Sequence, residues 1–166
     1  KVKKKRLNEG GKRFLNKRFK KKPFFSIITV VYNSEKYLEE TIKSVFNQSF
    51  KNFEYIIIDG GSSDGTYRII KKYEKKIDYW ISEKDSGIYD AFNKGMMVAQ
   101  GEFIGIINSD DKYKKDSLKI IYNYLRKNQA LDFIFGSVKK HWGILHGYRP
   151  EKIYYSWGFY SSPSTG

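Results

Sequence analysis

Apolar, β-branched runs alternate along the chain with segments whose apolar residues recur at helical spacing. Residues 24–32 form a mainly apolar run, which is typical of a strand buried on both faces of a parallel sheet. A helix is predicted to follow, with Ser34 as its cap and Glu35 in its first turn. Its apolar residues share one face: Leu38, Ile42, Val45 and Phe46.

The same strand-and-helix unit repeats further along the chain. We predict strands over residues 53–58, 78–82, 103–107 and 133–138, and helices over residues 66–76, 88–99 and 116–127. In the middle helix one face is expected to hold Ile88, Phe92, Met96 and Ala99. This alternation predicts an α/β fold with an open, mostly parallel sheet flanked by helices. Such sheets bind ligands in the crevice beyond the carboxyl ends of their strands.

A polar segment follows each of the first four predicted strands. These segments are residues 32–34, 59–65, 83–87 and 108–111, and three of the four contain carboxylates. Because the carboxyl ends of parallel strands meet at one edge of a sheet, we expect the four segments to converge there.

The last of these segments, Asn108-Ser109-Asp110-Asp111, is the strongest candidate for chemistry. It follows a buried strand, where a carboxylate is costly unless it is paired or bound to a cation. Mg²⁺ and Mn²⁺ prefer oxygen ligands and are typically held by one or two carboxylates together with substrate phosphates. The alternative is that Asp110 or Asp111 only caps the next helix.

Length and composition fit one domain with a real core, because the chain has 166 residues, of which 40% are hydrophobic. The absence of cysteine excludes disulfides and thiolate metal sites, and it fits a reducing cytoplasm. No apolar run approaches the roughly 20 residues that span a bilayer. We therefore predict a cytoplasmic protein, at most peripheral at the inner face of the membrane. His141 and His146 have no nearby acid cluster and are interpreted as surface or packing residues.

The net charge of +14 is concentrated at the start of the chain. Residues 1–22 carry 12 basic side chains and one acid, so +11 of the charge lies there and residues 23–166 are nearly balanced. We predict a flexible or helical basic segment over residues 1–22, followed by the domain proper. The segment is interpreted as a solvated linker or as a contact for anionic lipid at a membrane surface. Nucleic acid is the least favoured partner, since no recognition motif is present.

Four stretches in this order carry a resemblance to a known family: residues 26–33 (SIITVVYN), 59–66 (DGGSSDGT), 85–95 (DSGIYDAFNKG) and 108–111 (NSDD). Together they make the chain similar to the inverting glycosyltransferases of family two, over roughly residues 25–113. The resemblance implies the GT-A fold, which is Rossmann-like, and a nucleotide-sugar-binding domain over residues 23–166 whose acceptor part is incomplete.

The resemblance also implies a nucleotide pocket. Thr29 and Tyr32 would line it, with the Tyr32 ring against the base, and Asp59 would accept hydrogen bonds from a pyrimidine edge, which suits uridine. The family more often has two acids after the second strand, whereas Gly60 holds the second place here. The residues alone leave open that Tyr32 is a half-buried core aromatic and that Asp59 serves only its turn.

Further site residues follow from the same resemblance. Asp85 would contact the nucleoside and Lys94 a phosphate, although Asp90 and Lys94 also have the i, i+4 spacing of a surface ion pair. Asp110 would bind Mn²⁺ or Mg²⁺. Asn108 and Ser109 would lie near the ribose, and Asp111 would support the metal site or face the donor sugar.

The implied reaction transfers a sugar from a nucleotide diphosphate donor, such as a UDP-sugar, to a glycan or lipid-linked hydroxyl with inversion, as in surface polysaccharide synthesis. A carboxylate must act as general base, and in this family it usually comes from beyond the segment that residues 161–166 resemble. Glu151 is the one acid in the tail and a weak candidate. The alternative is a catalytically incomplete module that binds a nucleotide or a partner. Aromatic residues of the tail are expected to pack in the core or to line an acceptor groove: Trp142, Tyr154, Tyr155, Trp157 and Tyr160.

Overall fold

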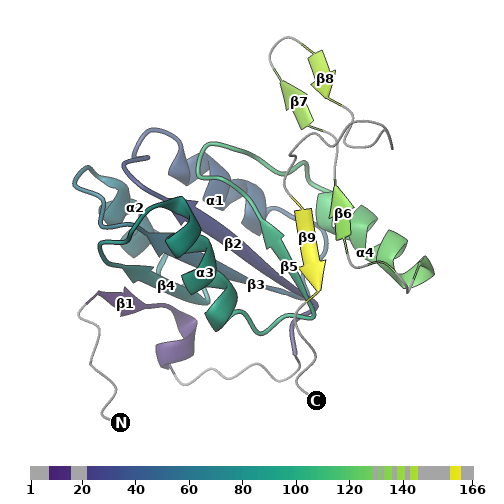
Figure 1. Cartoon of the computed structure of the whole chain (residues 1–166), viewed down its shortest axis with the longest axis horizontal. Helices are drawn as coiled ribbons and strands as arrows, with labels where there is room; N and C mark the ends of the chain where they lie inside the picture. Colours follow the sequence, from purple (N-terminus) through teal and green to yellow (C-terminus); the bar gives the residue numbers. More distant parts are fainter. Residues whose placement is uncertain are drawn as a thin grey trace.

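Seven strands form one sheet in the computed structural model, which describes residues 8–15, 22–128, 131, 133–135, 138–140, 143–145 and 158–161 (Figure 1). The strand order is β1-β4-β3-β2-β5-β9-β6, and β7 pairs with β8 as a separate two-stranded sheet. The bounds are Glu9–Gly10 for β1, Phe25–Val31 for β2, Phe53–Asp59 for β3, Tyr79–Ser82 for β4, Phe103–Ile106 for β5, Phe133–Phe135 for β6, Val138–Lys140 for β7, Gly143–Leu145 for β8 and Gly158–Ser161 for β9.

The four central strands, β4, β3, β2 and β5, run parallel to one another. The strands that flank them, β1 and β9, are antiparallel to their neighbours. The predicted α/β class with a mostly parallel sheet is confirmed. Four parallel neighbours also bring the turns after β4, β3, β2 and β5 to one edge of the sheet, in that spatial order.

Helices cover both faces of this sheet (Figure 1). On one face, α1 (Leu38–Phe46), α2 (Thr66–Tyr73) and α4 (Ser117–Lys127) contribute Ile42, Ile70 and Leu118 to a buried cluster. On the other face, α3 (Ile88–Val98) packs against β2 and β3. No helix in the described part of the chain combines the length and the apolar character that a membrane span requires.

The central strand β2 is buried along its whole length, as its mainly apolar sequence predicts. Alternate residues point to opposite faces, so Ile27 and Val31 pack against α1 and α4 while Ile28 and Val30 pack on the side of α3. Burying a side chain such as Ile28 completely stabilises the fold by about 1.5–3 kcal/mol. These contacts fix the carboxyl end of β2 in the middle of the sheet edge.

The predicted helix cap at Ser34 is wrong. Helix α1 begins at Leu38, with Tyr37 in the cap position and no side-chain cap. Ser34 is buried, and its backbone N–H donates instead to Thr66 Oγ1 at 2.9 Å. Residues 34–37 therefore form a turn that ties the end of β2 to the start of α2.

The predicted inner face of α3 also differs from the structure. Ile88 is 49% exposed and Met96 is 38% exposed, whereas Ala91 and Gly95 are buried against the sheet. An added Cβ at Gly95 would lie 2.6 Å from Ile28 Cγ2, so the helix backbone itself approaches the strand. Phe92 and Ala99, from the predicted face, do pack against the buried cluster on this side of the sheet. Hydrophobicity thus predicts part of the inner face and misses the small residues that set the close packing.

Residues 8–15 pack against the sheet, in contrast to the separate segment predicted before residue 23. Strand β1 pairs with β4, and the backbone N–H groups of Lys12 and Arg13, in the 3-10 helix η1 (Lys12–Leu15), donate to the carbonyls of Ile77 and Asp78. Residues 1–7 and 16–21, which hold most of the basic charge, lie outside the described residues. Part of the basic segment thus belongs to the domain.

Candidate functional site

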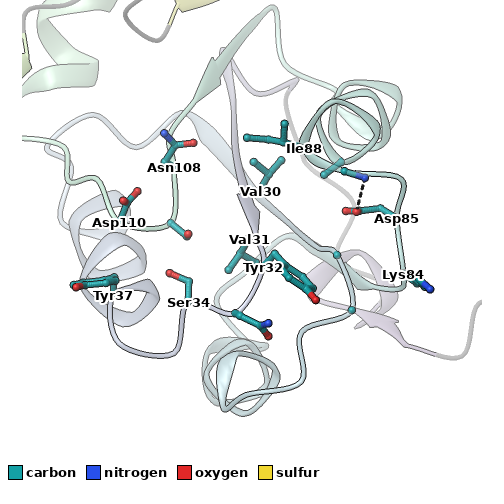
Figure 2. A pocket seen from close by; sticks show the side chains of 16 residues that line it. Val30, Val31, Tyr32, Ser34, Tyr37, Lys84, Asp85, Ile88, Asn108 and Asp110 are labelled. Atoms are coloured by element: carbon teal, nitrogen blue, oxygen red, sulfur yellow. Dashed lines mark hydrogen bonds between the residues drawn. The ribbon is translucent and has the colours of Figure 1, made fainter.

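A pocket of about 850 Å³ opens at the carboxyl edge of the parallel strands (Figure 2). Its lining comes from the segments after β2, β3, β4 and β5, together with the first turn of α3. The residues predicted from the sequence that line it are Tyr32, Asp85, Asn108, Ser109 and Asp110. The convergence expected from the strand pattern therefore takes place, over segments up to 78 positions apart in the chain.

Tyr32 presents its side chain at the mouth of the pocket, with 66% of its surface exposed. An exposed aromatic face at a pocket wall is suited to stacking against a planar ring. The alternative of a half-buried core aromatic does not describe this side chain.

The turn that holds Tyr32 is hydrogen-bonded to the turn after β3. Asn33 adopts a left-handed backbone with φ 48°, and its N–H donates to Ser62 Oγ at 2.8 Å. In return, the N–H of Ser63 donates to Asn33 Oδ1 at 2.9 Å. Asparagine tolerates the left-handed region better than most residues, which explains its place after Tyr32.

A second set of hydrogen bonds joins the same two turns. The Glu35 N–H donates to Asp64 Oδ2 at 3.0 Å, and the Gly65 N–H donates to Glu35 Oε2 at 2.9 Å. Burial alone raises the pKa of Asp64, but hydrogen bonds from Thr66 and from Glu35 outweigh it and lower the pKa. Asp64 and Glu35 therefore hold the two turns together and leave the chemistry to other groups.

Two residues predicted to bind the nucleotide lie beneath the pocket and do not line it. Thr29 is fully buried and shares a hydrogen bond of 2.9 Å with the Tyr55 hydroxyl. Asp59 is also fully buried; its carboxylate accepts from the hydroxyls of Ser62 and Ser82 and from the Ser62 N–H. Asp59 thus behaves as the turn residue of the alternative interpretation.

Asp85 and Lys94, which come from the same stretch of sequence, have different surroundings. The half-buried Asp85 lines the pocket, and its Oδ1 accepts from the Gly87 N–H at 2.9 Å (Figure 2). Lys94 is paired with Glu83 at 3.1 Å and with Asp90 at 3.2 Å and does not line the pocket. Burial alone lowers the pKa of Lys94, but these two partners outweigh it and raise the pKa. The ion-pair interpretation of Lys94 describes the structure.

The acidic turn lies on the opposite side of the pocket from Asp85 (Figure 2). Asn108, Ser109 and Asp110 line the pocket, and Asp110 is exposed. Among the described residues, none donates a hydrogen bond to the Asp110 carboxylate or forms an ion pair with it. Asp111 does not line the pocket; the Asn108 amide approaches its Oδ2 at 3.5 Å.

The turn is suited to a cation that brings other ligands with it. Over the described residues no group of three or more His, Cys, Asp or Glu side chains is placed to hold a metal ion. Mg²⁺ and Mn²⁺ sites that depend on one or two carboxylates are completed by substrate phosphates and water. The residues present therefore fit a divalent cation bound together with a diphosphate.

Sequence reasoning missed the residue that fixes this turn, Thr41. It is fully buried on α1, and its hydroxyl lies 2.8 Å from the carbonyls of both Ser109 and Asp111. The available signal was a polar residue at the helical spacing of Leu38 and Val45, on the buried face of α1. Lys84 also lines the pocket and had no distinguishing signal in the sequence.

Comparison with curated proteins gives many related glycosyltransferases. A putative teichuronic acid biosynthesis glycosyltransferase from Bacillus subtilis, TuaG, is 44% identical over 101 residues, which are 59% of this chain and 40% of that protein. An uncharacterized glycosyltransferase from Methanocaldococcus jannaschii is 33% identical over 139 residues, which are 79% of this chain and 48% of that protein. The chain thus spans less than half the length of these relatives.

Solved structures agree with the sequence matches. A TarS fragment from S. aureus in complex with UDP-GlcNAc has a TM-score of 0.60 and 31% identity, over 67% of this chain and 33% of that one. A mannosyltransferase from Pyrobaculum calidifontis, in complex with GDP-Man and Mn²⁺, has a TM-score of 0.67 at 18% identity, over 90% of this chain and 49% of that one. The predicted GT-A fold is confirmed. Since the sequence profile named Glycosyl transferase family 2 matches residues 26–164, the chain belongs to that family.

Proposed function

We propose that this chain binds the nucleotide-sugar donor of a metal-dependent glycosyltransferase, with UDP as the nucleotide. The observation that carries the proposal is the pocket at the sheet edge, which joins an exposed aromatic ring, Tyr32, to an exposed carboxylate, Asp110. A nucleoside diphosphate has a flat base at one end and an anionic diphosphate at the other. The two ends of the pocket therefore suit the two ends of such a ligand.

At the diphosphate end, Asp110 would hold Mn²⁺ or Mg²⁺. The bound cation would supply Lewis-acid stabilisation of the charge that grows on the leaving diphosphate. Asn108 and Ser109 would contact the ribose. Asp111 would support the turn, through the Asn108 contact and the hydroxyl of Thr41 on its carbonyl. Lys84, also in the lining, would offset part of the negative charge of the ligand.

The choice of UDP draws on a relative. TarS, at 31% identity, has been crystallised with UDP-GlcNAc. The mannosyltransferase that holds GDP-Man is 18% identical, so its likeness supports the fold alone. Stacking on Tyr32 tolerates any base, so the preference for uridine must come from polar groups near the ring.

The complete enzyme would transfer the donor sugar, with inversion, to a glycan or lipid-linked hydroxyl. The name of TuaG, which refers to teichuronic acid, favours synthesis of a surface polysaccharide. None of the described carboxylates is proposed as the general base. Glu151, the weak candidate from the sequence, lies outside the described residues.

Calorimetric titration with UDP and with GDP, each with and without Mn²⁺, tests the proposal. We expect binding that depends on the cation and is tighter for UDP. Asp110→Asn should lose at least about tenfold in affinity with Mn²⁺ present, because one anionic ligand is removed. Asp116→Asn is the matched control: its carboxylate accepts from Ser49 Oγ, away from the pocket.

Two results would count against this function. Affinity for UDP that is equal with and without Mn²⁺, or unchanged in Asp110→Asn, contradicts the metal assignment. Strong binding without any transfer, in the natural full-length protein with Mn²⁺ and glycan acceptors, would favour the alternative of a binding module without catalytic activity.

A further inference from the structure

The base end of the pocket contains a glycine whose conformation does not require glycine. Gly60, directly after β3, lies outside the left-handed region that Gly61 occupies at φ 81°. Alanine could therefore adopt the Gly60 backbone without strain. Another feature of the site must account for the missing side chain.

The space beside Gly60 is filled by a carboxylate from another loop. A Cβ built on Gly60 would lie 2.7 Å from Asp85 Oδ2 and 3.1 Å from its Cγ. At Gly61, a Cβ would lie 3.1 Å from the Lys84 backbone nitrogen. The two glycines thus let the loop after β4 approach the turn after β3 closely enough for Asp85 to reach the pocket.

The two oxygens of Asp85 are used differently. Oδ1 accepts from the Gly87 N–H at 2.9 Å, which fixes the carboxylate plane. No described residue donates a hydrogen bond to Oδ2. Figure 2 shows the carboxylate pointing into the space between Ile88 and Tyr32. A carboxylate held in this way offers one acceptor to a ligand stacked on the Tyr32 ring.

We propose that Asp85 reads the nucleobase in this protein and that Gly60 determines where its carboxylate lies. This inference rests on the proposed function. Asp59, the acid first expected in that role, is fully buried with both oxygens occupied by Ser62 and Ser82. The carboxylate that enters the pocket comes from the next loop and uses the volume that a side chain at position 60 would fill.

The chemistry of this acceptor selects a class of base. Uracil has a ring N–H at position 3, between its two carbonyls, and can donate to the carboxylate. Cytosine has the same ring size but an unprotonated nitrogen at that position, so two acceptors would face each other. An acceptor that a bound base covers without offering a donor is costly, and the site therefore favours uracil over cytosine.

The test compares UDP and CDP, both with Mn²⁺, by calorimetric titration on the full chain. We expect the wild type to prefer UDP by at least about tenfold, since hydrogen bonds to charged groups are among the stronger ones. In Asp85→Asn the preference should fall to within about threefold, because an amide can turn its donor toward cytosine. Asp85→Ala is a second variant that removes the carboxylate altogether and should give the same fall.

Gly60→Ala tests the second half of the inference. Its Cβ should displace the Asp85 carboxylate, so the variant should fold but show the same reduced preference for UDP. The double variant Gly60→Ala, Asp85→Asn should lose no more than either single variant, because both act on one contact. Asp116→Asn is the control, since its carboxylate accepts from Ser49 Oγ away from the pocket, and it should keep the wild-type ratio.

The possible results distinguish the roles of Asp85 and Gly60 from the proposed binding of a nucleotide-sugar donor. A wild type that binds no nucleoside diphosphate in a cation-dependent way contradicts both. Cation-dependent binding with equal affinity for UDP and CDP contradicts only the role of Asp85. A ratio that falls in Asp85→Asn and Asp85→Ala but stays at the wild-type value in a folded Gly60→Ala contradicts the role of Gly60.

Discussion

At the amino ends of the central strands, the carboxylates of Glu54 and Asp78 are buried against partners that the fold provides, whereas at the carboxyl ends Asp85 and Asp110 line an open pocket. Glu54 is fully buried and accepts from Arg13, from Ser26 Oγ and from the Gln100 N–H. No described residue donates to the Asp110 carboxylate. Acidic side chains therefore stabilise the fold at the amino edge of the sheet and stay available for a ligand at the carboxyl edge.

The partners at the amino edge come from the start of the chain. Arg13 reaches Glu54 and also donates to the Val98 carbonyl at 2.8 Å, while Lys12 lies 3.2 Å from Asp78. Burial raises the pKa of Asp78, although the Tyr55 N–H and Lys12 act in the opposite direction. Residues 8–15 thus compensate carboxylates that would otherwise be buried without counter-ions.

The largest expected effect follows from removing that compensation. Arg13→Ala should lower the free energy of unfolding by about 3–5 kcal/mol, the usual cost of breaking a buried ion pair by removing one partner. Deletion of residues 1–15 should cost at least as much, because it also removes β1 from the edge of the sheet. Urea denaturation followed by circular dichroism measures both.

Arg126→Ala, at an exposed arginine of α4, is the control for this prediction and should leave the unfolding free energy within about 0.5 kcal/mol of the wild type. The protein that remains folded after Arg13→Ala should keep its cation-dependent UDP affinity, since Arg13 lies at the opposite edge from the pocket. A loss below about 1 kcal/mol for Arg13→Ala would show that Glu54 does not depend on the start of the chain.

A change at the pocket edge should affect both stability and binding. Thr41→Val removes the hydroxyl that donates to the carbonyls of Ser109 and Asp111. We expect a loss of about 1–2 kcal/mol in unfolding free energy, because two part-buried carbonyls lose the one hydroxyl donor that they share. The affinity for UDP with Mn²⁺ should fall several-fold as the turn loosens.

Thr41→Ser, which keeps the hydroxyl, is the matched variant and should restore most of the UDP affinity. For both variants, titration calorimetry measures the affinity for UDP and urea denaturation measures the free energy of unfolding. Equal UDP affinity in Thr41→Val and the wild type would mean that the turn holds its geometry without this hydroxyl.

The sequence predicted the four central strands of the sheet and failed on contacts between distant segments. Strands β2 and β3 were predicted because each is a mainly apolar run rich in β-branched residues. Strand β9 was missed, since it is defined by pairing with β5 more than 50 positions earlier, and that pairing leaves no local periodicity. Strand β1 is only two residues long and carries no pattern at all.

The same limit applies to the candidate site. The rule that ligands bind beyond the carboxyl ends of parallel strands predicted which turns converge. It could not predict which acids of those turns face the pocket. Asp59 and Asp85 both follow strands, and only the buried hydroxyls of Ser62 and Ser82 around Asp59 separate their roles. Such contacts depend on the packing of two loops, which spacing within one loop does not encode.

The pocket carboxylates should contribute little to stability, in contrast to Glu54. Asp110→Asn, measured without metal, should change the free energy of unfolding by less than about 0.5 kcal/mol, because the side chain is exposed and no described residue donates to it. Thermal and urea denaturation in the presence of a chelator measure this. A loss above about 1 kcal/mol would place Asp110 with the structural carboxylates.

The smallest expected effect comes from an acid at the surface between α1 and α2. Hydrogen bonds from Lys43, Lys72 and Tyr73 lower the pKa of Glu39 to about 2. A carboxylate whose pKa is lower in the folded than in the unfolded state stabilises the fold above its unfolded pKa of about 4.5, and this contribution disappears as the pH falls towards 2. Glu39→Gln should therefore be slightly less stable than the wild type at pH 7 and equally stable near pH 2. Because the side chains of Lys43 and Lys72 are mostly exposed, salt should shrink the difference at pH 7. Urea denaturation at pH 7, 4.5, 3 and 2, each at low and high salt, measures it, and a difference that persists unchanged at pH 2 would mean that Glu39 acts through packing and not through its charge.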